Sequence, residues 1–506
     1  MATTYHTSAA PGPKDTASSR RRWLLSILSF PVVCMILMIG RILIFCVQQF
    51  AESDLWWHLR NAYSLLHYHS WSRVDTYSFT AAGTHWISFE WLSEVAYYLA
   101  FEAFGLQGIL LLYFAVLIVI FTAVYYRSWR AGADCKDAAV TTFAAICMGG
   151  VSIAPRTLLF GWLCMTGLLL VLDRFRQTGK GLWLLPPLFA VWINFHGSWP
   201  FGIVILVVTI VSGLLEGQWG LVVATRWSPA RLKGLVVSLA ASCVALFLNP
   251  FGYKLVFYPM DLMLHQKGVM QFIEEWGPAQ FGTVNGTLAL GLIFAVIAAV
   301  LFSRRTWRLD DALLAAFALW AALSHGRFLF FAGVIIMPIL APRLRLFPPY
   351  ERELEKPWLN AILLAGLAAA MAVYFPSESK LQKRVDNEYP KAALAFMRQH
   401  HINGRIFNQY KFGGYMELNA PEYKPFIDGR ADLYIYAGVF FDYLRASALQ
   451  HTFEILDRYK VQYVLVDPAE PMVYMLQHSP GWKTIYSDQV AVLIERTAVD
   501  APGGLH

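Results

Sequence analysis

A series of long apolar runs constrains the fold of this chain more than any other feature of its sequence. A window of about 19 residues, the length used to find transmembrane helices, gives about eleven such runs. The chain is 57% hydrophobic and only 15% charged, whereas soluble proteins are roughly a quarter charged. We therefore expect a polytopic α-helical membrane protein with about 11 transmembrane helices. They are expected at residues 24–48, 106–126, 138–154, 157–173, 182–196, 199–216, 234–249, 286–303, 310–324, 326–342 and 358–375.

The basic residues of the short loops predict the orientation in the membrane. Every second loop is rich in arginine and lysine, as in residues 127–136. Cytoplasmic loops carry such an excess, so we expect residues 1–22 to be a disordered cytoplasmic tail ahead of a transmembrane domain at 23–375. The odd number of spans then places the C-terminus on the extracytoplasmic side. Two long loops fall on that same side and cover residues 49–105 and 250–285.

The segment from residue 376 to residue 506 has a different character. It is less apolar, and shorter helical and strand patterns alternate along it, which is typical of a small α/β domain. Helices are expected in PKAALAFMRQHH and TFEILDRYK. Strands are expected in RIFNQY, KPFIDG, VQYVLVD, KTIYSD and QVAVLIER. The sequence therefore predicts an extracytoplasmic α/β domain after the last membrane helix.

The first long loop holds the densest group of ionisable residues. In ESDLWWHLR, Asp54 and His58 are four residues apart and share one face of a helix. Glu90 and Glu94 have the same spacing in HWISFEWLSEVAYY. Acids near a membrane can supply a general base or hold a divalent cation, Mg²⁺ or Mn²⁺, so Asp54, His58 and Glu90 form a candidate metal site. The alternative is a pair of polar interfacial helices with solvated acids.

Both long loops contain patterns of surface-lying helices. In the first loop, Trp56 and Trp57 are expected to anchor the helix at the membrane interface. The second loop has a similar pattern that ends in EEW, and a lipid-facing amphipathic helix is the alternative to a binding site there. Its candidate residues for a substrate or an anionic headgroup are His265, Glu275 and Trp276.

Two arginines, Arg156 and Arg327, are expected at the outer ends of membrane helices. Arginine in a short outer loop opposes the usual charge bias, so it needs an anionic partner. Guanidinium binds phosphate and carboxylate in a bidentate manner. A phosphate group is therefore one candidate partner, and an ion pair with Glu90 or Glu94 is the alternative.

The C-terminal domain contains a further candidate site in IFNQYKFGGYMEL and KPFIDGRADLY. Two adjacent glycines allow a tight turn from strand to helix, and Tyr415 follows them. Asp428 and Arg430 come after an expected strand, a common place for sites in α/β domains. The alternative is turn chemistry with a stabilising Asp–Arg pair.

These features together resemble the GT-C glycosyltransferases, which use polyprenyl-phosphate-linked sugars. ESD after the first span matches the place where that superfamily carries its catalytic acid, which implies Asp54 as the base and Glu52 as its neighbour. The pattern from DLWWHLR through DTYSFTAAGTHWISFEWLSE is similar to bacterial membrane proteins grouped with protein mannosyltransferase-like enzymes, which implies a bacterial inner membrane. QYKFGGYMEL resembles the WWDYG region of oligosaccharyltransferases, but Phe412, Gly413 and Gly414 replace its tryptophan and aspartate positions.

The predicted function is transfer of a sugar from a polyprenyl-phosphate donor to a hydroxyl of a lipid, glycan or protein. Asp54, Glu52 and His58 are the expected catalytic residues, and Arg156, Arg327 and His265 are expected to bind the donor phosphate. A non-catalytic transporter or flippase and a membrane scaffold with an outer binding domain remain alternatives. The net charge of +7 comes from loop residues, so no nucleic-acid partner is expected. The expected acceptor or substrate contacts are Glu90, Glu94, Glu275, Trp276, Tyr415, Asp428 and Arg430.

Overall fold

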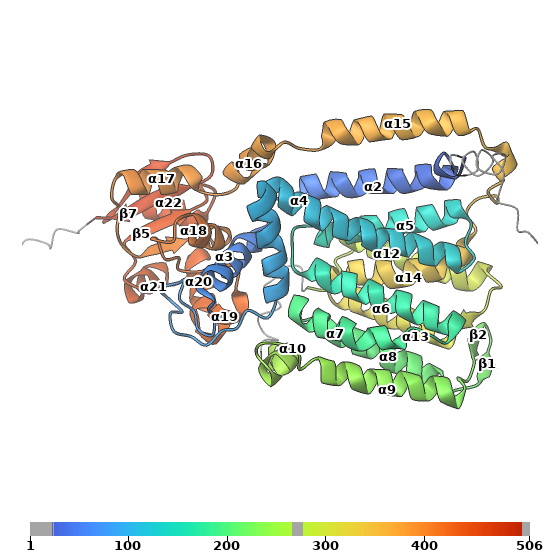
Figure 1. Ribbon diagram of the computed structural model, residues 1–506. Coiled ribbons are helices and arrows are strands. Elements are labelled where there is room, and N and C mark those ends of the chain that lie inside the picture. Colours follow the sequence, from blue (N-terminus) through green and yellow to red (C-terminus); the bar gives the residue numbers. More distant parts are fainter. Residues whose placement is uncertain (1–22, 24, 266–276, 498–506) are drawn as a thin grey trace, which may run out of the picture.

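The computed structural model describes residues 23, 25–265 and 277–497. Roughly parallel helices, here called the helical bundle, lie beside a C-terminal region of residues 376–497 (Figure 1). The expected N-terminal tail lies outside the described residues. The helices up to residue 374 are α2 (Phe30–Gln48), α3 (Asp54–Tyr68), α4 (Trp91–Arg130), α5 (Cys135–Gly149), α6 (Leu158–Thr178), α7 (Leu185–Phe195), α8 (Trp199–Ser212), α9 (Pro229–Ala245), α10 (Tyr253–His265), α12 (Val284–Phe302), α13 (Leu309–Ser324), α14 (Leu329–Leu344) and α15 (Pro357–Tyr374).

The bundle is that of an integral membrane protein. Within the described part, 6 helical segments are long and apolar enough to cross a membrane: α2, α4, α6, α12, α14 with the turn before it, and α15. A helix occupies each range in which a span was expected. However, α7 has only 11 residues and rises about 16 Å, roughly half of a hydrocarbon core. The expected count of about eleven spans is therefore not confirmed.

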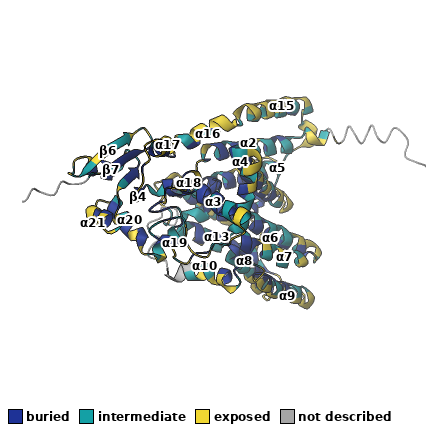
Figure 2. Cartoon of the chain, turned by 60° about the vertical axis from the view of Figure 1, so that its left-hand side comes forward, coloured by how far each residue is buried: buried dark blue, intermediate teal, exposed yellow. Residues whose placement is uncertain are grey.

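Burial differs strongly between the helices of the bundle (Figure 2). Every residue of α14 from Leu329 to Pro342 is buried, whereas Asn360 is the buried residue of α15. Where α5 crosses α14, a Cβ atom on Gly333 would lie 3.3 Å from the Cα atom of Ala145. Small residues allow such close crossings in membrane proteins. The bundle thus has a sheltered centre and outer helices whose apolar faces suit lipid.

Helix α4 is broken at Phe104 and Gly105, which separate its first part from the longer part that follows. Gly105 has a φ of 60°, a left-handed conformation that glycine adopts without a steric cost. The carboxylate of Glu378 accepts hydrogen bonds of 2.9 Å from the backbone N–H groups of Leu106 and Gln107. The start of the C-terminal region therefore caps the helix that resumes after the break.

The C-terminal region contains a four-stranded sheet in the order β4-β5-β7-β6. β4 (Ile406–Asn408) is parallel to β5 (Tyr463–Val466), and the remaining neighbours are antiparallel. The other two strands are β6 (Trp482–Ser487) and β7 (Val492–Arg496). Its helices are α16 (Glu378–Asp386), α17 (Lys391–Gln399), α18 (Gly413–Asn419), α19 (Ala431–Tyr436), α20 (Val439–Ser447), α21 (Thr452–Arg458) and α22 (Pro471–Gln477).

The strand expected in KPFIDG does not form, and this prediction was wrong. The segment makes a single bridge, between Pro425 and Ile406. Pro425 has no N–H to donate to a ladder. The side chain of Asn408 instead accepts from the N–H of Phe426 at 2.7 Å and donates to the carbonyl oxygen of Ile427 at 2.8 Å. An amide side chain therefore replaces the sheet hydrogen bonds that the pattern predicted.

A second, small sheet closes the end of the bundle that is remote from the C-terminal region (Figure 1). It consists of β1 (Gly217–Trp219), β2 (Val222–Ala224) and β3 (Trp307–Arg308). β1 pairs with β2 in an antiparallel manner, and β2 pairs with β3 in a parallel manner. This sheet joins the loop between α8 and α9 to the loop between α12 and α13.

Candidate functional site

Asp54 is the first residue of α3, at the junction between the helical bundle and the C-terminal region. α18 packs closely on α3, since a Cβ atom on Gly414 would lie 3.1 Å from the backbone nitrogen of Trp57. A Cβ atom on Gly429 would lie 2.0 Å from Oδ1 of Asp54. A glycine is therefore required at position 429 for the observed approach of the C-terminal region to the Asp54 carboxylate.

Asp54 is half-buried, and its carboxylate lies among other charged groups. Trp57 donates to Oδ1 of Asp54 from its Nε1 atom at 3.3 Å. Burial and the nearby charge of Glu52 raise the pKa of Asp54 to about 6, against the opposing charges of His58 and Arg156. A carboxyl with this pKa is mostly ionised at neutral pH and can still accept a proton, which suits a general base.

Arg156 lies beside Asp54 but pairs with Glu52. Its Nε atom is 2.7 Å from Oε2 of Glu52. The expected alternatives for Arg156 were a phosphate or an ion pair with Glu90 or Glu94, and the observed carboxylate belongs to a different acid. The role of Arg156 in phosphate binding stays a prediction, because the same guanidinium has further donors than the Nε–H.

His58 is held between Glu94 of α4 and Glu90, the N-cap residue of that helix. Its Nδ1 atom is 3.0 Å from Oε1 of Glu94, and its Nε2 atom is 3.8 Å from Oε2 of Glu90. Ser88 donates to the other oxygen of Glu94 at 2.6 Å. Burial lowers the pKa of His58, but the hydrogen bond and charge of Glu94 and the charges of Glu90 and Asp54 outweigh it, so that the pKa is raised. His58 is therefore stabilised as an imidazolium between carboxylates.

Glu90 connects this group to two further segments. Thr157 donates to its Oε2 atom at 2.7 Å, and Nε2 of His196 lies 3.0 Å from its Oε1 atom. Burial raises the pKa of Glu90 to about 7, although the charge of His58 opposes the shift. Burial and the nearby charges of Arg327 and His58 lower the pKa of His196 to about 3. Arg327 therefore belongs to the same electrostatic neighbourhood as the acids.

The metal site expected at Asp54, His58 and Glu90 is not assembled by these contacts. Within residues 23, 25–265 and 277–497, no group of three or more His, Cys, Asp or Glu residues is arranged to hold a metal ion. Both ring nitrogens of His58 face carboxylates, whereas a metal ion needs a nitrogen lone pair. A divalent cation in this protein stays a prediction.

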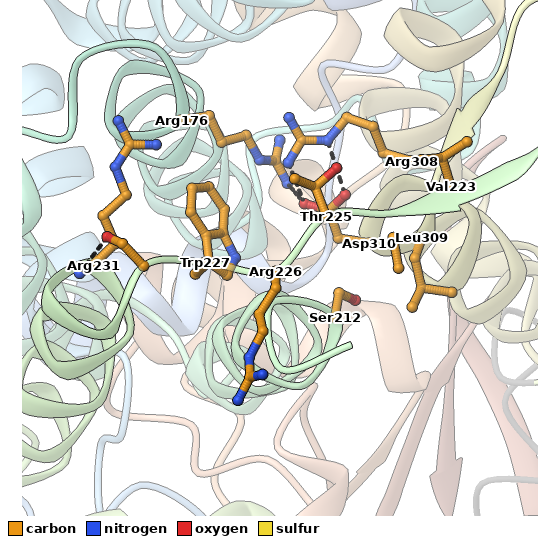
Figure 3. Close-up of a pocket in the computed structure, with 12 residues that line it drawn as sticks. Arg176, Ser212, Val223, Thr225, Arg226, Trp227, Arg231, Arg308, Leu309 and Asp310 are labelled. Carbon is orange, nitrogen blue, oxygen red and sulfur yellow. Dashed lines mark hydrogen bonds and ion pairs between the residues drawn. The ribbon is translucent and has the colours of Figure 1, made fainter. Parts of the chain in front are cut away.

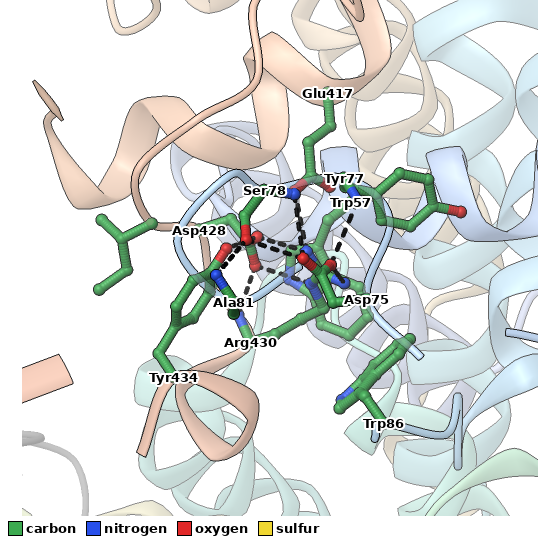
Figure 4. A network of polar contacts seen from close by, with 12 residues as sticks. Trp57, Asp75, Tyr77, Ser78, Ala81, Trp86, Glu417, Asp428, Arg430 and Tyr434 are labelled. Carbon is green, nitrogen blue, oxygen red and sulfur yellow. Dashed lines mark hydrogen bonds and ion pairs between the residues drawn. The ribbon is translucent and has the colours of Figure 1, made fainter. Parts of the chain in front are cut away.

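Arg430 joins the first long loop to the C-terminal region through a buried network (Figure 4). Its guanidinium is 2.8 Å from Asp75, 2.6 Å from Asp428 and 3.0 Å from Glu417. Tyr434 donates a further hydrogen bond to Asp428. Burial and the charge of Asp428 raise the pKa of Glu417, which favours its protonated form.

This network changes the roles expected for Asp428 and Arg430. Their side chains are 0% and 1% exposed, so neither can contact an acceptor in this arrangement. Asp428 and Arg430 form the stabilising Asp–Arg pair that the sequence analysis gave as the alternative. Asp75 of the first long loop is a further partner of Arg430.

The aromatic residues of α3 pack inside the protein, and their expected position at the membrane interface was wrong. Trp56 and Trp57 are only 3% and 6% exposed. Trp56 meets the rings of Tyr389 and Tyr415 edge-on, with centroids 5.3 and 5.1 Å away, and those two tyrosines stack on each other. The C-terminal region covers the face of α3 that was expected to contact lipid. Tyr415 is part of this packing and is buried.

The remaining candidates lie elsewhere or outside the described residues. Arg327 follows α13 in a short 3₁₀ turn, Gly326–Phe328, and its carbonyl oxygen accepts from Ser152 at 3.4 Å. His265 ends α10, and its side chain is outside the described part. Glu275 and Trp276 fall in the undescribed segment. Their expected contacts with substrate stay predictions.

Sequence reasoning missed several residues of the junction. His196 was expected only to pack or to form a hydrogen bond, with no partner specified, and it contacts Glu90. For Asp75, the sequence DTYS contains a weak local pattern of a turn, because a serine follows the aspartate three residues later. In the structure, the hydroxyl of Ser78 donates to Asp75 at 2.7 Å. Gly429 and Tyr410, whose hydroxyl donates to the Gly429 carbonyl at 3.1 Å, carry no signal of their contact with this site.

Comparisons with known proteins agree with this architecture. No protein-family model matches the chain, and no curated protein matches its sequence. Among solved structures, the archaeal oligosaccharyltransferase AglB from Archaeoglobus fulgidus, in complex with an inhibitory peptide and a dolichol-phosphate, has a TM-score of 0.50 and 11% identity. The match covers 96% of this chain and 75% of that chain.

Two other solved structures are similar at lower scores. The oligosaccharyltransferase of Archaeoglobus fulgidus in its apo form has a TM-score of 0.49 at 11% identity, over 87% of this chain and 69% of that one. The mycobacterial arabinofuranosyltransferase AftD has a TM-score of 0.46 at 12% identity, over 96% of this chain and 40% of that one. At such identities the likeness to AglB concerns the fold alone, and it shows that this chain has a GT-C-like fold.

Proposed function

We propose that this protein is a membrane glycosyltransferase that moves a sugar from a polyprenyl-phosphate-linked donor to a hydroxyl group of a lipid, glycan or protein. The observation that carries the proposal is the Asp54 carboxylate. Asp54 is half-buried, the pKa of its carboxylate is raised to about 6, and it begins α3, where that helix meets the C-terminal region. The GT-C-like fold supports this class of reaction.

In the proposed reaction, Asp54 takes the proton of the acceptor hydroxyl while the acceptor oxygen attacks the anomeric carbon of the donor. The new bond joins the acceptor oxygen to that carbon, and the bond from the carbon to the phosphate oxygen breaks. The polyprenyl phosphate leaves with the electron pair. A general base in this position contributes about 10²–10⁴-fold to the rate.

The developing charge on the leaving phosphate requires a cationic partner. Arg156, which lies near Asp54, and Arg327, whose charge reaches His196, are the proposed donors of hydrogen bonds to it. The dolichol-phosphate in the AglB complex is consistent with a lipid phosphate as part of the donor. A divalent cation would strengthen this stabilisation, and loss of transfer after chelation with EDTA would support it.

The acceptor is proposed to carry a hydroxyl group. AglB was solved in complex with an inhibitory peptide. This chain, however, has Phe412, Gly413 and Gly414 where the oligosaccharyltransferase motif carries tryptophan and aspartate. Gly413 also packs tightly, because a Cβ atom there would lie 2.0 Å from the Ile427 carbonyl oxygen. A larger side chain for peptide recognition does not fit at that position.

The test is an Asp54→Asn variant in membrane vesicles supplied with polyprenyl-phosphate-linked mannose, glucose or arabinose. We expect transfer of radiolabel to an acceptor to fall about 10²–10⁴-fold, since the amide cannot accept the proton. Asp386→Asn is the matched control, because Asp386 pairs with Lys391 on the surface. Undiminished transfer by a folded Asp54→Asn variant would overturn the base. Movement of the intact donor across the vesicle, without cleavage, would favour the transporter instead.

A further inference from the structure

A cavity of about 370 Å³ lies at the end of the bundle that is remote from Asp54 (Figures 1 and 3). The end of α6, the end of α8, the strand β2, the start of α9 and the start of α13 form its walls. The loops at this end are those predicted to be cytoplasmic. The cavity is here called the inner arginine pocket, because its lining includes Arg176, Arg226, Arg231 and Arg308.

Two of the four arginines are already neutralised. Arg176 is 2.6 Å from Asp310, and Arg308 is 3.0 Å from the same carboxylate. Figure 3 shows these three side chains grouped on one side of Trp227. Two further carboxylates lie near Arg176 but do not line the pocket, and they belong to Asp173 and Asp311.

The other two arginines give the pocket its excess positive charge. Within the described part of the chain, neither Arg226 nor Arg231 has an ion pair with a carboxylate. Arg231 lies 5.5 Å from the ring of Trp227, a contact that leaves its N–H donors available for an anion. The side chain of Arg226 is exposed. Two guanidinium groups beside one cavity are a typical environment for phosphate.

The wall of the pocket also holds donors that lack a partner. The hydroxyl of Ser212 is buried, the residue is 6% exposed, and it makes no hydrogen bond with any of the described residues. The Nε atom of Arg176 is likewise buried and has no acceptor within the described part of the chain. Both residues line the cavity. Because buried polar groups are almost always paired in native proteins, these donors point to an acceptor that enters from outside.

The start of the neighbouring helix α9 adds a weaker positive charge to the pocket. α9 begins at Pro229, and the hydroxyl of its N-cap residue Ser228 accepts from the N–H of Arg231 at 3.4 Å. The start of a helix carries partial positive charge. The helices that lead to the pocket also expose apolar side chains, for instance Val211 on α8 and Val237 on α9, and such surfaces suit contact with lipid.

We propose that the inner arginine pocket binds a phosphate group, with Arg226 and Arg231 pairing with its oxygens and Ser212 donating a hydrogen bond. The phosphate can belong to an anionic lipid headgroup or to a free phosphate ion. The cavity has the size of a small-ligand site. This site lies at the opposite end of the bundle from Asp54, so it is independent of the proposed transfer reaction.

The test measures binding to the full-length protein purified in a neutral detergent. Short-chain phosphatidylglycerol and inorganic phosphate are the two probes, and native mass spectrometry or isothermal titration counts what binds. We expect the Arg226→Gln/Arg231→Gln double variant to bind at least about tenfold more weakly, since it loses two charge-assisted pairs. Arg304→Gln is the matched control, because Arg304 is exposed in a loop at the same end of the bundle and does not line the pocket.

A second variant tests the buried donor without removing charge. Ser212→Ala removes the hydroxyl and leaves the helix unchanged, so it is expected to weaken binding of the same probe. Selective loss with phosphatidylglycerol alone would identify a lipid headgroup, and loss with both probes would identify the phosphate ion itself as sufficient. An equal loss in Arg304→Gln, or unchanged binding in the double variant, would overturn the proposal.

Discussion

The Arg430 network and the Asp54 group lie on either side of the same junction, and they use carboxylates in opposite ways. Around Arg430, three acids close on one guanidinium that is 1% exposed. Asp54 is only half-buried as a residue, and burial of its carboxylate together with the charge of Glu52 raises the pKa to about 6. The first arrangement satisfies its charges internally and joins two regions. The second leaves a carboxylate that can take up a proton, which is what catalysis requires.

Removing Arg430 should have the largest effect on stability. Arg430→Met leaves Asp75, Asp428 and Glu417 buried without their cation, and breaking a buried ion network in this way costs about 3–5 kcal/mol. Thermal unfolding of the detergent-purified protein should show a clearly lower Tm. Arg445→Met is the control, because Arg445 is exposed and lies 3.9 Å from Asp442. Its free energy of unfolding is expected to change by no more than about 1 kcal/mol. Similar shifts in both variants would mean that the network does not hold the junction.

A methyl group at position 429 should affect transfer more than stability. Gly429→Ala would place Cβ 2.0 Å from Oδ1 of Asp54, so the carboxylate or the loop must move. A displacement of about 1 Å in a catalytic group can reduce the rate by about 10²-fold. Transfer assays and thermal unfolding of the same preparation separate the two effects. Gly366→Ala on α15 is the control, because a Cβ atom there meets nothing within 4 Å.

Neutralising Glu52 should have the smallest effect, on the pH dependence of transfer. The charge of Glu52 raises the pKa of Asp54, so Glu52→Gln should lower it. Transfer needs the Asp54 carboxylate ionised, and its rise with pH, expected near pH 6, should therefore move to lower pH by up to about one unit. Rates of transfer measured from pH 4.5 to 8 test this expectation. Glu454→Gln is the control, because Glu454 is exposed. An acid limb at the same pH in both variants would exclude Glu52 as a neighbour that tunes the base.

The helical bundle could be predicted from the sequence because a run of apolar residues is a local property. The positions of α12 and α15, for example, follow the expected ranges closely. Helix length is less predictable, since α7 is sheltered by neighbours and need not match the bilayer by itself. The spacing of Asp54 and His58 on one helix was predicted for the same local reason, and both lie on α3.

Contacts between distant segments account for what the sequence did not predict. Trp56 and Trp57 have the composition of an interfacial anchor, but α18 and Tyr389 cover them. The pairing of Asp75 with Arg430 spans the first loop and the C-terminal region. Local patterns identify which side chains can ionise, and only the packing of the two regions decides which of them remain reactive.

The cap that Glu378 places on the broken helix α4 couples the position of the C-terminal region to that of α4. Glu378 belongs to α16, at the start of the C-terminal region, and it holds the N–H groups of Leu106 and Gln107. If the C-terminal region swings away from α3, it must either release these two hydrogen bonds or pull the break in α4 with it. Glu94 lies in the part of α4 before the break, and Glu90 is the N-cap residue of that helix. A movement of the C-terminal region that uncovers Asp54 would therefore also displace the acids that contact His58.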